Sequence, residues 1–153
     1  MRKLAEAFYF MTITLWVGGM WAIGYIVAPV LFASLGDRQL AGVVAGKLFA
    51  LIGWIGLGSA AYLMLFLIVR WGGQFFRRGV FWLVLLTGAL VAVSQFGIQP
   101  LMAQLKADAL PREVMESVLR DRFAAWHGIS SILYLVQSVL GLWLVVWANR
   151  GLR

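Results

Sequence analysis

Four long apolar runs without a charged side chain dominate the pattern of this chain. Each run is between 22 and 30 residues long, and together they cover residues 7–36, 48–69, 79–105 and 123–149. About 20 residues of α-helix cross a hydrocarbon core about 30 Å thick. The pattern therefore predicts an all-α integral membrane four-helix bundle that forms a single transmembrane domain over residues 1–153, with helices at about 6–31, 46–69, 79–107 and 123–149.

The connection between the third and fourth helices carries a helical pattern of its own. Apolar residues recur at helical spacing from Val114 to Trp126, and charged residues fill the opposite side. Pro111 suits the first position of a helix, where its missing N–H has no intrahelical partner. The spacing predicts a short amphipathic helix over about 111–122, which either lies at the lipid boundary or acts as a lid.

Polar side chains inside the predicted spans form two stripes. They recur at three- and four-residue steps on the third and fourth helices, at Gln95, Gln99, His127, Ser130, Tyr134 and Gln137. Lipid supplies no hydrogen bonds, so buried polar groups need partners in protein or water. The stripes are expected to face each other, either as structural contacts at about 0.6 kcal/mol each or as the lining of a polar pocket.

Two prolines lie about one turn inside a helix end on the side of the membrane away from the termini. Proline removes the hydrogen bond to the carbonyl four residues earlier, so Pro29 and Pro100 free the carbonyls of Tyr25 and Phe96. Freed carbonyls are tolerated at membrane depth only where protein or water satisfies them. The pattern fits either two ordinary helix kinks or a small polar cavity.

The candidate ligand-binding residues are the polar groups that their predicted depth brings to this same side, namely Tyr25, Lys47, Gln95, Gln99, His127 and Ser130. An ionisable residue inside a membrane is a functional candidate by default. His127 is the only histidine. It acts either as a proton or ligand switch or as a hydrogen-bonded residue at a helix start.

Composition narrows the chemistry of the predicted pocket. The chain has one histidine and no cysteine, so we predict no metal site and no cofactor. It has no paired intramembrane carboxylates, no Ser-His-Asp set and no phosphate-binding loop, which favours a non-enzymatic role. Hydrophobic residues make up 63% of the chain and charged residues 12%, where soluble domains carry about a quarter charged.

Charge predicts how the chain lies in its membrane. The net charge is +7, but the cations lie at predicted membrane edges, so positive-inside bias explains them and no nucleic-acid partner is expected. The connection over 70–78 contains no acid, which favours cytoplasmic termini in a bacterial inner membrane. Its Arg70, Arg77 and Arg78 are candidate contacts for anionic lipid, or else simple topology anchors.

Two blocks of residues resemble a known family. One runs from Ala28-Pro29-Val30 through Gly42 to Gly46-Lys47-Leu48-Phe49, and the other is Phe123-Ala124-Ala125-Trp126-His127-Gly128-Ile129-Ser130. Both are similar to the transmembrane protein 205-like proteins, or domain of unknown function 4149. The resemblance implies a four-helix membrane bundle in which a family motif matters, carried here by Pro29, Gly42, Lys47, Phe49, His127 and Ser130. It implies no established reaction.

These observations predict a membrane protein that binds a lipid, a small molecule or a partner protein in a polar pocket in the outer leaflet. Membrane lipids and further copies of the chain are the other expected partners. Two alternatives stay open: a small transporter or permease component that acts as an oligomer, and a haem- or porphyrin-handling redox protein.

Overall fold

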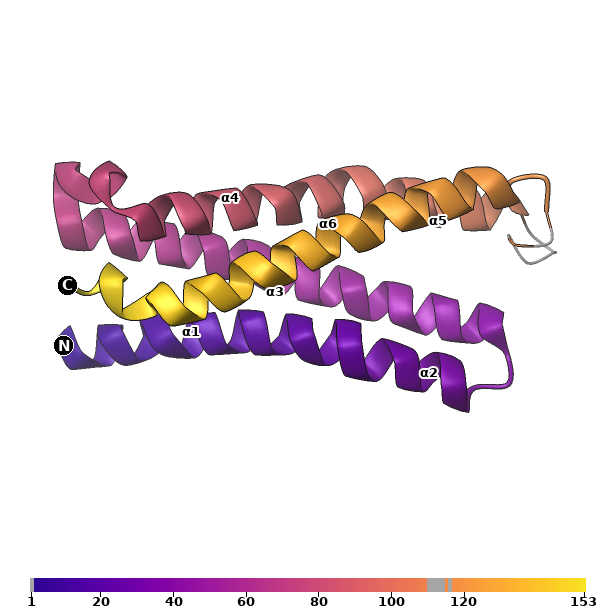
Figure 1. Cartoon of the computed structure of the whole chain (residues 1–153), viewed down its shortest axis with the longest axis horizontal. Coiled ribbons are helices and arrows are strands. Elements are labelled where there is room, and N and C mark those ends of the chain that lie inside the picture. The colour runs from indigo at the N-terminus through magenta and orange to yellow at the C-terminus, as the bar shows by residue number, and fades with distance from the viewer. Residues whose placement is uncertain (1, 110–114, 116) are drawn as a thin grey trace.

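The chain folds into a bundle of four long helices (Figure 1). The computed structural model describes residues 2–109, 115 and 117–153, and all regular structure in this part is helical. The four helices are long and apolar enough to cross a membrane, and they cover Arg2–Ser34, Arg38–Arg77, Gly79–Ala109 and Arg120–Gly151. The prediction of an all-α four-helix bundle of membrane type is confirmed.

The first two spans are built from five helical segments. The first span contains α1 (Arg2–Ala22), the π-helical turn η1 (Ile23–Val27) and α2 (Ala28–Ser34). The second contains α3 (Arg38–Trp71) and the 3₁₀ turn η2 (Gly72–Arg77).

The last two spans also consist of five segments. The third span contains α4 (Gly79–Val93), the π-helical turn η3 (Ser94–Ile98) and α5 (Gln99–Ala109). The fourth contains α6 (Arg120–Trp147) and the 3₁₀ turn η5 (Ala148–Gly151). Of the predicted amphipathic helix over 111–122, positions 111–114 and 116 lie outside the described residues. The described remainder is not one helix, because 117–119 form a bend and a turn and Arg120 already begins α6.

The second helix starts earlier than the sequence predicted. It begins at Arg38 and not near residue 46. The side chain of Asp37 accepts a hydrogen bond from the backbone N–H of Leu40 at 3.0 Å, which caps the helix. The prediction relied on charged residues, which mark only where the hydrocarbon core ends. The helix itself can begin earlier, in the headgroup region, because the Asp37 side chain caps it there.

The end of the bundle that carries both termini is closely packed (Figure 1). Tyr9, Ile13, Trp16 and Leu63 are each at most 2% exposed. Lipid tails are as apolar as these side chains, so association depends on close packing rather than on burial from water. Small residues allow this packing, because a Cβ atom on Gly88 of α4 would lie 2.8 Å from that of Ala60 in α3.

Polar contacts tie the end of the chain to the other helices. The Tyr9 hydroxyl donates to the Ala148 carbonyl at 3.1 Å, and the Trp71 indole donates to the Gly151 carbonyl at 2.9 Å. Arg70 donates to the Leu152 carbonyl at 2.8 Å, and its Nη2 atom lies 3.4 Å from a carboxylate oxygen of Glu6.

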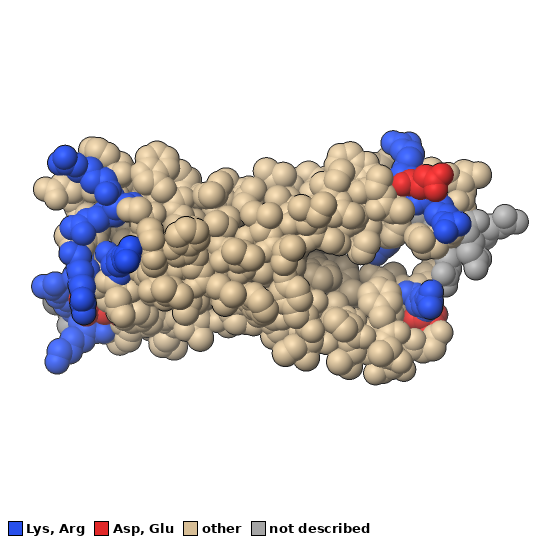
Figure 2. All heavy atoms as spheres, in the orientation of Figure 1, with Lys and Arg blue, Asp and Glu red and all other residues tan. Residues whose placement is uncertain are grey.

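The surface is apolar between two charged ends. Figure 2 shows Lys and Arg gathered at the terminal end and a mixture of both signs at the opposite end, with an uncharged band between them. Many large apolar side chains in this band are exposed, for example Leu15 at 62% and Ile132 at 66%. A lipid-facing surface is expected to look like this, and the protein is therefore a membrane protein.

Candidate functional site

The two halves of the bundle separate toward the end away from the termini. Figure 1 shows α2 and the start of α3 on one side and α5 and the start of α6 on the other. Between them lies a cavity of about 1020 Å³ that is lined by residues of all four spans. The space-filling view shows the surface hollowed in this region (Figure 2).

Five of the six predicted ligand-binding residues line this cavity. They come from three spans and are Tyr25, Gln95, Gln99, His127 and Ser130. Gln95 is the most buried at 8% exposure, whereas His127 is exposed and Tyr25 is 40% exposed. The structure therefore brings together polar groups that lie up to 105 positions apart in the sequence, from Tyr25 to Ser130.

Lys47 is the predicted residue that the structure places elsewhere. It is exposed and is not among the residues that line the cavity. Its neighbour Gly46 does line the cavity, and one position along an α-helix rotates a side chain by about 100°. Lys47 was predicted from its depth alone, and its helix face is not the one that lines the cavity.

A different lysine enters the cavity. The Lys106 ammonium donates to the Gly42 carbonyl at 3.0 Å, which links α5 to α3 across the gap. It also lies 3.8 Å from the positions that Cβ atoms on Gly42 and Gly46 would occupy, so it sits at ordinary contact distance over this part of α3. The Phe123 ring centroid of α6 is 5.8 Å away, which adds a weak cation–π contact.

Replacing Lys106 with methionine is expected to let α3 and α5 separate further at this end. The variant loses a hydrogen bond from a charged donor, a contact that contributes about 1.5–3 kcal/mol. Spin labels on cysteines introduced at Arg38 and Asp108 report the distance between the helices, and the chain has no other cysteine. The distance distribution should shift to longer values and broaden. Lys47→Met is the matched control, and an equal distribution in the two variants would contradict this role of Lys106.

The backbone widens just before each of the two prolines. In the π-helical turns η1 and η3, the N–H groups of Ala28 and Gln99 bond to carbonyls five residues earlier, at Ile23 and Ser94. Each turn ends two residues before a proline, at Pro29 and at Pro100. A wider turn relieves the clash between a proline ring and the carbonyl four residues before it. Such turns are frequent at functional sites.

Some polar groups near the cavity are committed to structural hydrogen bonds. The Gln137 amide donates to the Leu90 carbonyl at 3.2 Å and to the Ser94 hydroxyl at 2.9 Å. The Tyr134 hydroxyl donates to the Met20 carbonyl at 2.6 Å. The Gln137 contacts join α6 to the third span, as the structural interpretation of the polar stripes predicted, whereas Tyr134 bonds to α1 instead.

Five other polar side chains that line the cavity make no such contacts. Those of Tyr25, Gln95, Gln99, His127 and Ser130 form no hydrogen bond with any residue that the structure describes. No polar atom of the three less exposed side chains, Gln95, Gln99 and Ser130, is completely enclosed. Polar groups at membrane depth need partners. Five such groups around one cavity can bind the polar part of a ligand.

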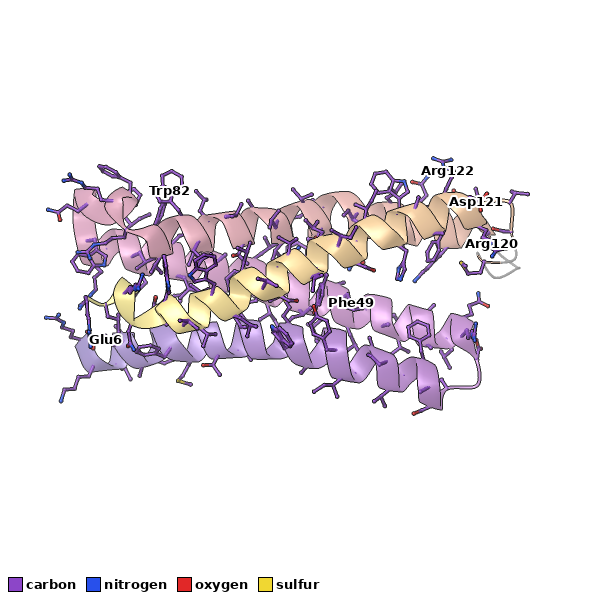
Figure 3. All side chains as sticks on the ribbon, viewed as in Figure 1. Glu6, Phe49, Trp82, Arg120, Asp121 and Arg122 are labelled. Atoms are coloured by element: carbon purple, nitrogen blue, oxygen red, sulfur yellow. The ribbon has the colours of Figure 1, made fainter. Side chains whose placement is uncertain are left out.

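Aromatic rings surround these polar groups. The Phe49 ring meets Tyr134 edge to face at 5.1 Å between centroids, and Figure 3 shows Phe49 between the two helix pairs. The ring of Tyr25 packs against that of Trp21 with 4.6 Å between the ring centroids. The His127 ring stacks on the Phe123 ring with 5.9 Å between centroids and 9° between the ring planes. The cavity therefore combines apolar walls with a few polar groups, as small-molecule sites commonly do.

A comparison of the sequence with protein-family models identifies the family of this chain. The sequence model of the family described as Domain of unknown function (DUF4149) matches residues 11–111. The chain belongs to this family. Neither the curated proteins nor the solved structures contain a match to this DUF4149 protein.

The DUF4149 match covers part of the motif that the sequence resemblance proposed. Pro29, Gly42, Lys47 and Phe49 lie within the matched residues, whereas His127 and Ser130 lie beyond them. In this DUF4149 protein Pro29 follows a π-helical turn, and Gly42 accepts the hydrogen bond from Lys106. The cavity thus lies partly within the matched region and partly on α6.

Proposed function

We propose that this DUF4149 protein binds an amphipathic small molecule or a lipid in the cavity, without catalysing a reaction on it. One observation carries the proposal, namely that five polar side chains face one cavity and form no hydrogen bond with any described residue. A hydrogen-bonding head group supplies the partners that these side chains need.

The walls of the cavity favour an apolar portion on the same ligand. Trp16, Met20, Phe32, Ile52 and Ile98 all line it. The volume of about 1020 Å³ lies near the upper end of ligand sites, which span about 300–1,000 Å³. A molecule with a small polar head and a hydrocarbon or ring system matches this lining better than a fully polar solute does.

The proposed side of the membrane is the outer leaflet. The basic connection at η2 and both termini lie at the end opposite to the cavity (Figure 1). Lys and Arg accumulate on the cytoplasmic side of bacterial inner membranes. With the termini in the cytoplasm, the ligand enters from the outer leaflet.

Native mass spectrometry of protein extracted from its source membrane tests the proposal. Wild-type protein should carry a copurifying ligand mass, and Gln95→Leu and Gln99→Leu should each retain it about tenfold less. Lys47→Gln is the matched control, because Lys47 is exposed and outside the cavity lining. Circular dichroism establishes that all variants fold.

Three results would overturn the proposal. The first is wild-type protein without any bound mass, and the second is equal retention by the Gln95 and Lys47 variants. The third is a ligand with the mass of a haem or porphyrin, which would favour the redox alternative. The mass of a retained ligand also decides between a lipid and a smaller amphipathic molecule.

A further inference from the structure

A second hollow lies at the opposite end of the bundle, and its lining is strongly basic. It has a volume of about 360 Å³ and is formed by the start of α4 and the end of the chain. Its lining residues are Arg77, Arg78, Gly79, Val80, Trp147, Arg150 and Arg153, so four of the seven are arginines and none is acidic. We propose that this hollow binds the phosphate of an anionic phospholipid headgroup.

The four arginines of the hollow differ from the others at this end in having no acidic partner. Arg2 and Arg70 both pair with Glu6, at 3.3 Å and 3.4 Å. By contrast, the side chains of Arg77, Arg78, Arg150 and Arg153 form no ion pair or hydrogen bond with any residue that the structure describes. Four unpaired positive charges around one hollow attract an anion and repel one another in its absence.

Aromatic stacking holds two of these guanidinium groups in place. Arg78 lies over the Trp71 ring at 3.6 Å from the centroid, and Arg150 lies over the Trp147 ring at 4.3 Å. A guanidinium that stacks on a ring keeps its N–H groups free at the edge of its plane. Those edges bind phosphate oxygens in pairs, which adds geometric preference to the charge.

The first turn of α4 adds backbone donors to the hollow. Gly79 is the first residue of this helix, and no side chain caps its N-terminus. The absence of a Cβ on Gly79 lets the Trp147 ring pack closely, because a Cβ there would lie 3.2 Å from the ring. This contact holds the end of the fourth span against α4 and so gathers arginines from the η2–α4 connection and from the end of the chain around one hollow.

The proposed depth of the hollow favours a lipid phosphate over free phosphate as its ligand. Trp71, Trp82 and Trp147 all lie at this end, and the Trp82 indole, labelled in Figure 3 near the start of α4, donates to the Phe76 carbonyl at 2.7 Å. Tryptophan is enriched at the depth of lipid headgroups. The hollow therefore opens where phospholipid phosphates are concentrated, and not in the open solution where free phosphate is met.

Arg70 is not part of this proposed site, although the sequence made it a candidate for lipid contact. Its side chain is only 16% exposed and is occupied by Glu6 and the Leu152 carbonyl. The arginines near the end of the chain take its place, since η5 folds back against the start of α4.

The test is a lipid titration of the purified full chain, read by native mass spectrometry. Phosphatidylglycerol should bind more tightly than phosphatidylcholine. The double variant Arg150→Gln/Arg153→Gln should weaken phosphatidylglycerol binding by about 25-fold, or about fivefold for each arginine. The matched control is Arg2→Gln/Lys3→Gln, which removes the same charge at the same end but outside the hollow, and it should change binding less than about twofold.

A competition experiment distinguishes a lipid phosphate from free inorganic phosphate. Inorganic phosphate at 100-fold excess over lipid should not displace phosphatidylglycerol, and displacement would assign the hollow to a free anion. Equal binding of both lipids, or equal loss in the hollow and control variants, would also overturn the proposal. If the double variant fails to fold, the single variant Arg77→Gln replaces it in the same titration, with an expected loss of about fivefold. None of these results depends on the cavity at the other end.

Discussion

Gly88→Val is expected to destabilise the bundle by about 2–3 kcal/mol, because it forces α3 and α4 apart where Gly88 faces Ala60. A Cβ at Gly88 would lie 2.8 Å from the Cβ of Ala60, which is bonded directly to the α3 backbone and cannot rotate away. Overpacking against a rigid neighbour costs more than overpacking against the end of a flexible side chain. The measurement is unfolding in mixed micelles of increasing sodium dodecyl sulfate content, followed by far-UV circular dichroism.

The matched control for this prediction is Gly58→Val. Gly58 is exposed on α3, and a Cβ there would meet no atom within 4 Å. The same substitution at this position should leave the free energy of unfolding within about 1 kcal/mol of wild type. Equal effects at Gly88 and Gly58 would show that the close approach of the two helices contributes little to stability.

Arg70→Met is expected to destabilise the terminal end of the bundle by about 2 kcal/mol, because hydrogen bonds to charged groups contribute about 1.5–3 kcal/mol. The variant loses the hydrogen bond to the Leu152 carbonyl and the ion pair with Glu6. Glu6 keeps its contact with Arg2 at 3.3 Å, so the carboxylate is not left unpaired. The same unfolding measurement gives the change in stability, and trypsin cleavage after Arg150 reports the release of the chain end.

Lys3→Met serves as the control for Arg70→Met. Lys3 is an exposed cation at the same end and makes no ion pair with a described residue. Its variant should unfold and be cleaved like wild type. If Arg70→Met also behaves like wild type, the contacts of Arg70 are surface contacts of little energetic value.

The number and position of the spans could be predicted because excluding charge from lipid is a strong and local constraint. The same constraint could not give the start of α3, where Asp37 caps a helix that extends beyond the apolar run. The π-helical turns were not predicted either. Pro29 and Pro100 indicated a backbone irregularity, but the sequence does not say whether the helix kinks or widens there.

Five of the residues that line the cavity were predicted from polar residues at a common depth, whereas Lys47 and Lys106 could not be assigned in this way. Depth is read from distance along the chain, but entry into a cavity also depends on the helix face. A signal for Lys106 was present, because it continues the stripe of Gln95, Gln99 and Met102 at helical spacing. Its charge places Lys106 just beyond the apolar run over 79–105, which obscures its position on the same helix face.

The closely packed terminal half of the bundle closes the inner end of the cavity. A guest that enters between the helix pairs meets Trp16 and, beyond it, side chains such as Ile13 and Leu144 that are at most 2% exposed. It must leave by the way it came. Passage to the other end of the bundle would require the closely packed helices of this half to move apart.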